Sequence, residues 1–361
     1  PPHMSGEQVA VEHTGTIENH PDLRAELQQK GVVFSSEPDT EVIAHLRAAL
    51  LAEGQGILDA TRNAVAHLVG AYALAVISPD DPDHLIVSRA GSPLVIGVGV
   101  GEHFIASDVF ALLPVTQRFI FLEEGDIAEI RRDGITIYDA AGESVERDVR
   151  TSELSASNAE KGPYRHYMLK EIFEQPAVIA ETLEGRIHKG RLLEQSFGHV
   201  AQELFDRTQS VQIIACGTSY HAGLVARYWL EEAGIPCQIE VASEFRYRRS
   251  VVPPGCLFVT ISQSGETADT LAALRAAKQA GYIGSLVVCN VPESSLVRES
   301  DVALMTRAGP EIGVASTKAF TTQLVALRLM VLALAKRHGL SAAQEQDWVE
   351  ELQALPRQVE V

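Results

Sequence analysis

Apolar and polar residues alternate along the chain in two rhythms, and the change between them divides the sequence into two parts. Residues 1–150 combine helical periodicity with many short apolar runs separated by Gly and Asp turns. Strands this close together favour antiparallel pairing, which predicts an α+β layered domain. The expected helices are 20–30, 39–53 and 58–69, and the expected strands are 8–13, 71–78, 84–89, 94–98, 103–106, 118–122, 126–131 and 135–138.

From residue 211 onward the rhythm changes to strand–loop–helix units, typical of a parallel sheet with right-handed crossovers. Ligands in such sheets bind at the carboxyl ends of the strands, where loops lead into helices. Residues 151–163 are small and polar, which predicts a linker. The expected strands are 211–215, 237–241, 256–261 and 285–290, and the expected helices are 164–184, 191–208, 219–233, 267–280, 294–299 and 316–338.

Composition narrows the function classes. A length of 361 residues suits two domains, and 46% hydrophobic with 22% charged residues is typical of a globular protein. The formal net charge of −18 argues against a nucleic-acid-binding surface and fits a cytoplasmic enzyme. Four cysteines without a CxxC pair predict core packing rather than a disulfide framework or a metal site. The apolar run 324–335 contains Arg328 and is too short to span a membrane, and no signal peptide is visible.

Two Ser/Thr-rich loops each follow a predicted strand and precede a helix. One contains Gly217, Thr218 and Ser219, and the other is 262–267, with the sequence SQSGET. Gly permits a close backbone approach, and free N–H groups at a helix N-terminus attract a phosphate. The hydroxyls of Ser219, Ser262, Ser264 and Thr267 add donors without charge. Side-chain capping of the helices is the alternative for either loop alone; the two loops together favour a phosphate site.

Other segments carry weaker signals. Residues 311–318 open a long helix with Ser, Thr and Lys, and beside the two loops they are expected to complete a sugar pocket. In the first half, Gly15 follows a predicted strand and its amide is free to face a ligand. Asp39 begins a helix, where capping is the alternative role. Residue types and spacing alone name no reaction.

Taken together, these segments resemble glucosamine-6-phosphate synthase, the isomerising glutamine–fructose-6-phosphate aminotransferase family. The resemblance covers nearly the whole chain. The matching stretches are 17–20 (IENH), 39–45 (DTEVIAH), 70–72 (GAY), 88–94 (SRAGSPL), 119–127 (FIFLEEGDI), 164–175 (YRHYMLKEIFEQ), 216–220 (CGTSY), 244–247 (EFRY), 262–267 (SQSGET) and 313–323 (GVASTKAFTTQ).

The resemblance implies an α/β fold in two parts. A partial N-terminal-nucleophile domain, a class II glutaminase with α+β layers, is followed by a sugar-isomerase (SIS) subdomain with a doubly wound, flavodoxin-like parallel sheet. The implied ranges are 1–150 for the later part of the glutaminase domain, 151–203 for the linker and start of the isomerase domain, 204–342 for the first SIS subdomain, and 343–361 for the start of the connection to a second one.

In that family glutamine is hydrolysed, ammonia passes through a channel, and fructose 6-phosphate becomes glucosamine 6-phosphate without a cofactor or metal. The resemblance implies that Gly15 supplies an oxyanion-hole amide and that Asp39 holds the glutamine α-amino group. It implies sugar-phosphate contacts at Cys216, Gly217, Thr218, Ser219, Ser262, Gln263, Ser264, Thr267 and Val314. It further implies a cytoplasmic homodimer with glutamine and fructose 6-phosphate as substrates and without nucleic-acid or membrane partners.

This sequence departs from the family at positions that matter for activity. Thr14 stands where the family has the oxyanion-hole Asn. Strand-like 9–11 follows a start without Met, and 358–361 lies inside a helical pattern, so both ends are expected to be cuts. The nucleophilic Cys, the Schiff-base Lys and the second SIS subdomain are then missing, and this polypeptide alone is expected to be inactive.

Two other functions remain open from the sequence. A non-catalytic sugar-phosphate sensor also uses SIS domains, although the acidic, strand-rich first half differs from a basic helix-turn-helix segment. An isomerase or deglycase relative would dispense with glutaminase residues. Asp39 and Gly15 speak against that second alternative, while Thr14 leaves it open.

Overall fold

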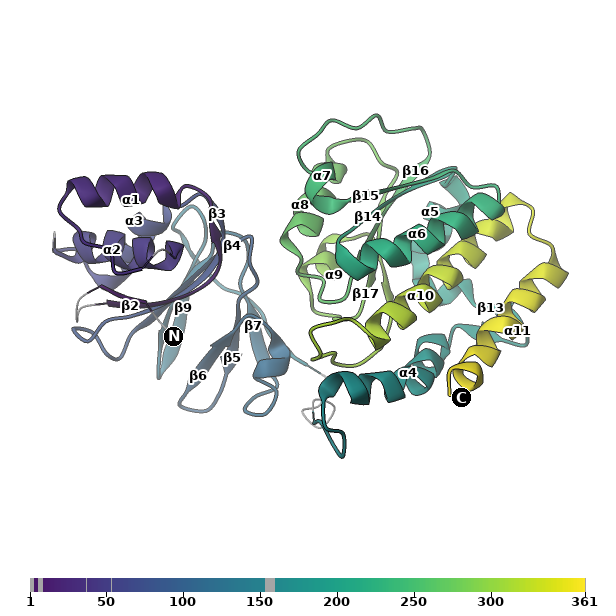
Figure 1. Cartoon of the computed structure of the whole chain (residues 1–361), viewed down its shortest axis with the longest axis horizontal. Helices are drawn as coiled ribbons and strands as arrows, with labels where there is room; N and C mark the ends of the chain where they lie inside the picture. Colours follow the sequence, from purple (N-terminus) through teal and green to yellow (C-terminus); the bar gives the residue numbers. More distant parts are fainter. Residues whose placement is uncertain (1–2, 6–8, 37, 53, 153–159, 361) are drawn as a thin grey trace. The chain divides into compact units, whose positions relative to one another are not determined.

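The computed structural model describes residues 3–5, 9–36, 38–52, 54–152 and 160–360. The chain forms two compact units, 1–156 and 157–361 (Figure 1). Most of the predicted linker, residues 153–159, lies outside the described residues. Its first residue, Thr151, is the last residue of a strand in the structure.

The described residues of unit 1 form two antiparallel sheets, three α-helices and a short 3-10 helix. The larger sheet has the order β1-β2-β3-β4-β8-β9-β10 and the smaller one β11-β7-β5-β6. The predicted antiparallel α+β arrangement is confirmed. The elements are β1 (His3–Ser5), β2 (Val9–Ile17), α1 (His20–Gln29), α2 (Asp39–Ala52), α3 (Ile57–Val65), β3 (Gly70–Ile77), β4 (Leu85–Ala90), β5 (Val95–Val98), β6 (His103–Ala106), β7 (Arg118–Phe121), β8 (Ile127–Arg131), β9 (Gly134–Tyr138), β10 (Ser144–Val145) and β11 (Val149–Thr151).

The alternation of side chains along β3 separates two cores of unit 1. Leu74 and Val76 pack with Ile43 of α2 in one cluster. Ala73 faces the other way and packs with residues of the smaller sheet, such as Ile96. Successive strand residues point to opposite faces, so the larger sheet is covered by a helix on one face and by the second sheet on the other.

Unit 2 contains a five-stranded parallel sheet with the order β15-β14-β16-β17-β18. This is the flavodoxin-like order, with β14 as the first strand of the sheet in the chain, so the predicted doubly wound sheet is confirmed. The elements are α4 (Tyr167–Leu183), β12 (Ile187–His188), β13 (Arg191–Leu192), α5 (His199–Arg207), β14 (Ser210–Ala215), α6 (Gly217–Glu232), β15 (Cys237–Val241), α7 (Ala242–Phe245), β16 (Cys256–Ser262), α8 (Ala268–Lys278), β17 (Ser285–Cys289), α9 (Ser295–Glu299), β18 (Val302–Met305), α10 (Lys318–Ala335) and α11 (Ala342–Val359).

Helices cover both faces of this sheet (Figure 1). Ile213 belongs to the cluster that contains residues of α4, α5, α6, α10 and α11. Its neighbour Ile214 belongs to the cluster formed with α7, α8 and α9. Strands buried on both faces explain why the sequence shows continuous apolar runs here instead of alternation.

Two sequence predictions are wrong in detail. The first strand does not end at residue 13, because β2 continues to the buried Ile17 and pairs with β3 along that length. Residues 191–208 do not form one helix. They contain β13, a short 3-10 helix and α5, because Gly190 and Gly198 have positive φ angles of 70° and 93° that interrupt helical geometry.

Within the described residues one helical segment, 318–338, is long and apolar enough to cross a membrane. Of its most apolar window, 78% is buried inside the protein. It contains α10, which packs along α6 and α4 in the core of unit 2 (Figure 1). The segment therefore has the surroundings of a core helix.

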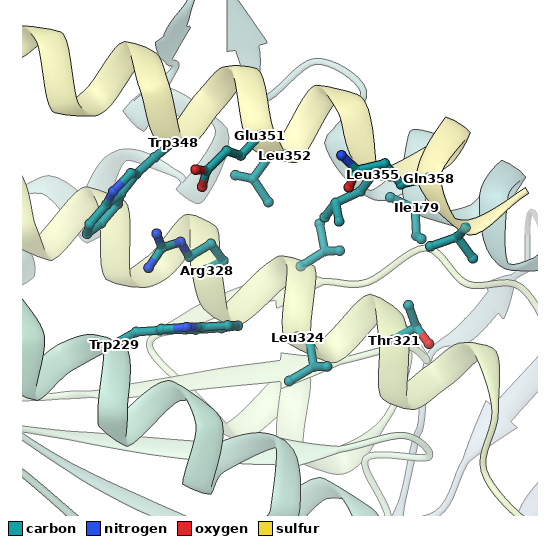
Figure 2. A pocket seen from close by; sticks show the side chains of 12 residues that line it. Ile179, Trp229, Thr321, Leu324, Arg328, Trp348, Glu351, Leu352, Leu355 and Gln358 are labelled. Atoms are coloured by element: carbon teal, nitrogen blue, oxygen red, sulfur yellow. The ribbon is translucent and has the colours of Figure 1, made fainter. Parts of the chain in front are cut away.

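A cavity of about 540 Å³ lies beside α10, between α4, α6 and α11 (Figure 2). The guanidinium of Arg328 lies between the rings of Trp348 and Trp229, 3.7 and 5.2 Å from their centroids. Aliphatic side chains such as those of Leu324 and Leu352 line much of the rest, together with polar residues such as Glu351. None of the predicted site residues lines this cavity, so it is separate from the candidate sugar site.

Glu41 fixes the segment before α2 through four hydrogen bonds. The backbone N–H and hydroxyl groups of Ser35 and Ser36 donate to its carboxylate at 2.6–2.8 Å, and Nε2 of His45 lies 3.4 Å away. Burial by itself raises the pKa of Glu41, but these hydrogen bonds outweigh it and lower the pKa from 4.5 to about 2. The ionised carboxylate therefore stabilises the start of α2.

Glu41→Gln is expected to lower the free energy of unfolding at pH 7 by about 2–3 kcal/mol. Because the folded-state pKa is depressed, this contribution is complete above about pH 4.5 and disappears as the pH falls toward 2. Urea unfolding at pH 7 and pH 3 tests this, with the exposed Glu26→Gln as a control. An equal difference from wild type at both pH values contradicts it.

Candidate functional site

The two Ser/Thr-rich loops leave the same edge of the sheet side by side. β14 and β16 are neighbouring parallel strands, and Ala215 pairs with Ile261 in their register. Each strand ends within one residue of this pair and leads through a loop into a helix, α6 or α8. The loops therefore begin next to each other at the carboxyl ends of the strands.

The first loop presents the N-terminus of α6. Cys216 is the N-cap residue, and Gly217 adopts a φ of 56°, which favours glycine. Thr218 and Ser219 follow in the first turn. The hydroxyl of Ser219 accepts a hydrogen bond of 3.0 Å from Nε2 of the buried Gln323. Because an accepting hydroxyl keeps its own proton, Ser219 remains able to donate to an anion.

The second loop folds upon itself before α8. The hydroxyl of Ser262 accepts from the Gly265 amide at 3.0 Å and lies 3.2 Å from the hydroxyl of Thr267. The hydroxyl of Ser264 accepts from the Glu266 amide at 3.2 Å. These contacts gather three hydroxyls within one turn of chain, and each hydroxyl that accepts from an amide keeps a proton to donate.

The second loop is also held by hydrogen bonds to the residues after β17 and at the start of α9. The Gln263 carbonyl accepts from the Asn290 amide at 3.3 Å, just beyond β17. The Glu266 carboxylate accepts from the Ser295 amide at 2.6 Å, at the start of α9. The loop is thus held against the next strand and helix of the sheet, which fixes the positions of its hydroxyls.

Capping does not account for the Ser and Thr residues at these helix starts. Among the described residues, no side chain caps α6 or α8; Cys216 and Thr267 occupy the N-cap positions without a side-chain cap hydrogen bond. The first-turn N–H groups of both helices are therefore available to a ligand, and the helix dipoles make these positions favourable for negative charge.

The third segment, residues 311–318, forms a turn closed by one carboxylate. Glu311 accepts from the amides of Thr317 and Ala319 at 2.9 and 3.0 Å and from the hydroxyl of Ser316 at 3.1 Å. Val314, at the tip of this turn, is fully exposed at 106%. An exposed apolar residue at the tip leaves its backbone accessible to a ligand.

Lys318 at the end of this segment is not free to bind an anion. It is buried, and its ammonium pairs with Glu174 of α4 at 2.7 Å. The hydrogen bond from Gln323 to Ser219 joins α10, which follows the third segment, to the first loop. A buried contact that the sequence did not reveal therefore connects the helix after the third segment to the first loop.

In unit 1, the predicted glutamine-binding residues gather where β2 meets α2. Asp39 accepts from the Ile17 amide at 2.9 Å, and its other oxygen lies 3.6 Å from Nδ1 of His13. Burial lowers the pKa of His13 from 6.5, and the nearby Asp39 reverses only part of that effect. His13 is therefore mostly neutral at pH 7, so its contact with Asp39 is not a charged ion pair.

Thr14 and Gly15 are exposed on the same part of β2. Gly15 has a φ of 137°, and a Cβ at this position would lie 2.0 Å from the Ala71 carbonyl oxygen. Only glycine fits this backbone conformation and close approach to β3. The structure thus explains a glycine at position 15 and leaves its backbone uncovered.

Sequence reasoning missed His13 and Gln323. His13 lies directly before the predicted pair Thr14 and Gly15, but its partner Asp39 is 26 residues further along the chain (39 − 13). Gln323 is a buried amide in a largely apolar helix, but its burial is evident only from the structure, so the sequence gives no signal for it. Of the cysteines, three are buried as predicted and Cys216 is half-buried in the first loop; burial raises the pKa of Cys237 to about 12.

Comparisons with known proteins agree with this architecture. Residues 203–333 match the SIS domain family, and residues 1–114 match a glutamine amidotransferase domain family. Over 357 residues, 98% of this chain, it is 61% identical to glutamine–fructose-6-phosphate aminotransferase (isomerizing) of Pseudomonas putida. The corresponding enzyme of Pseudomonas aeruginosa is 58% identical over the same length. The match covers 58% of each relative.

A solved structure is also similar. It is the C-terminal domain of glucosamine-fructose-6-phosphate aminotransferase from Francisella tularensis, 55% identical with a TM-score of 0.54. The match covers 55% of this chain and 56% of that one.

The protein thus combines a glutamine amidotransferase domain with antiparallel sheets and a SIS domain with a parallel sheet. It belongs to the glutamine–fructose-6-phosphate aminotransferase (isomerizing) family, as its sequence motifs predict. The chain spans a little under three-fifths of the length of these relatives.

Proposed function

We propose that the protein makes glucosamine 6-phosphate from fructose 6-phosphate and glutamine, and that unit 2 binds the sugar phosphate. The observation that carries this proposal is the pair of uncapped helix N-termini at adjacent strand ends, surrounded by hydroxyls. Uncapped amides favour a phosphate, and hydroxyl donors let an acidic protein hold it without a cation. The relatives' names supply the particular substrates.

In this proposal the first-turn amides of α6 and α8 bind the phosphate together with side-chain hydroxyls. The remaining contacts orient the sugar, and the backbone of Val314 reaches it from the third segment. The hydroxyl donors are Ser219, Ser262, Ser264 and Thr267, and the residues that line the pocket are Cys216, Gly217, Thr218 and Gln263.

Unit 1 is proposed to bind glutamine. The Asp39 carboxylate is oriented by a hydrogen bond from the Ile17 amide and binds the α-amino group of glutamine. The Gly15 amide donates to the oxyanion that forms when the side-chain amide is attacked. Thr14 is a shorter donor than the family's Asn, and the loss of one oxyanion donor reduces rates by roughly a hundredfold or more.

We propose further that the 361 residues by themselves bind sugar phosphate without making glucosamine 6-phosphate. The chain spans 58% of the length of its relatives, and the inactivity is proposed because the family resemblance implies that catalysis also uses a Cys nucleophile and a Schiff-base Lys beyond the matched stretches. The proposed division keeps 1–150 as glutaminase, 151–203 as the connection, 204–342 as the SIS subdomain and 343–361 as the start of a second connection. The whole protein is proposed to be a cytoplasmic homodimer.

Titration calorimetry on the 361-residue chain tests this function. Glucose 6-phosphate and fructose 6-phosphate are expected to bind saturably at one site per chain, whereas glucose is expected not to bind. A coupled assay with fructose 6-phosphate and glutamine is expected to yield no glucosamine 6-phosphate. Absence of binding by both sugar phosphates contradicts the proposed site, and product formation contradicts the proposed inactivity.

A further inference from the structure

One face of α4 holds the third segment and the start of α10. The residues on this face are Glu171 and, one turn further along the helix, Glu174 and Gln175. Glu174 pairs with Lys318 at 2.7 Å, and Gln175 accepts from the Thr321 hydroxyl at 2.5 Å. These contacts join parts of the chain that are more than 140 residues apart in sequence.

Glu171 makes the contact closest to the tip of the third segment. Its carboxylate is buried, with 2% exposure of the residue, and one oxygen accepts from the amides of Ile312 and Gly313 at 2.6 and 2.9 Å. A Cβ on residue 313 would lie 2.4 Å from the other oxygen of Glu171. Glycine at this position therefore permits the carboxylate to approach the backbone this closely.

This contact and the closure by Glu311 hold the segment from two sides. Glu311 binds the amides that follow Val314, and Glu171 binds the two amides that precede it. Val314, between them, is fully exposed. With both of its flanks fixed by charged hydrogen bonds, the backbone of Val314 has one defined position.

We infer that Glu171 is a positioning residue for the sugar-contacting segment 312–316. The inference rests on the proposed function, because it concerns how the same pocket binds the sugar part of the ligand. When the two amides lose their carboxylate acceptor, the segment populates other conformations. The apparent affinity then falls in proportion to the fraction of molecules that still have the binding-competent conformation. The phosphate loops make none of these hydrogen bonds, so the effect is confined to the sugar.

Glu171→Gln separates this role from a merely structural one. Titration calorimetry of the 361-residue chain is expected to show about tenfold weaker binding of glucose 6-phosphate, the effect of one weakened hydrogen bond to a charged group. Inorganic phosphate, measured as a competitor at the same site, is expected to bind within about twofold of wild type. The exposed Glu181→Gln on the same helix is a matched control and is expected to change neither affinity.

Gly313→Ala approaches the same contact from the loop side without removing a buried charge. It is expected to weaken glucose 6-phosphate binding in the same selective way, with the thermal unfolding midpoint recorded for each variant. Unchanged sugar-phosphate affinity in both variants overturns the inference, as does an equal loss for sugar phosphate and inorganic phosphate. If the wild-type chain binds neither ligand, the proposed function itself fails, which is a different result.

Discussion

Gly265→Ala is expected to lower the free energy of unfolding by about 2–5 kcal/mol and to abolish sugar-phosphate binding. Gly265 has a φ of 67°, and a Cβ there would lie 2.0 Å from the Ser294 hydroxyl and 2.8 Å from the Cys289 sulfur. These neighbours are buried and cannot withdraw into solvent. The loop must therefore shift, which displaces the hydroxyls on either side of it.

Gly234→Ala provides a matched control for this effect. Gly234 has a similar φ of 77°, but a Cβ there meets nothing within 4 Å. In the control variant only backbone strain is added, so its free energy of unfolding is expected to fall by about 1–2 kcal/mol. It is expected to bind glucose 6-phosphate normally. Urea unfolding of both variants measures the difference. Equal losses of stability would show that the second loop has room for a side chain and is not held as described.

Removing the hydroxyls of Ser219 and Thr267 together is expected to weaken glucose 6-phosphate binding by about a hundredfold or more. Each hydroxyl is placed to donate one hydrogen bond to a charged acceptor, and such bonds contribute about 1.5–3 kcal/mol each. The variant Ser219→Ala/Thr267→Val keeps the size of the side chains nearly unchanged. Titration calorimetry with glucose 6-phosphate measures the loss.

The control for this variant is Ser300→Ala. Ser300 directly follows α9 and lies two residues before β18, at the opposite, amino edge of the sheet. Its removal is expected to leave the affinity unchanged. A double variant that binds as well as Ser300→Ala would mean that these hydroxyls do not contact the ligand.

Local patterns predicted the sheets and the loops, because they depend on residues close together in sequence. The apolar runs that form β14 and β16 are followed by Gly, Ser and Thr, and this order alone places the loops at the ligand-binding edge of a parallel sheet. The helix predicted for 191–208 is wrong because Gly190 and Gly198 adopt positive φ angles, which the pattern of apolar residues does not reveal.

Contacts between distant parts of the chain could not be predicted from the pattern. The partner of Gln323 is 104 residues away, and the partners of Glu171 are 141 and 142 residues away. In the sequence both residues read as ordinary helix positions. The roles proposed for Asp39 and Val314 rest on the family resemblance, because residue type and spacing do not show which ligand these residues would face.

A crystal structure of the chain with glucose 6-phosphate would test the central claim most directly. We expect one phosphate group within about 3 Å of the hydroxyls of Ser219 and Thr267 and of first-turn amides of both α6 and α8. A phosphate bound elsewhere, or in contact with only one of the two loops, would contradict the account.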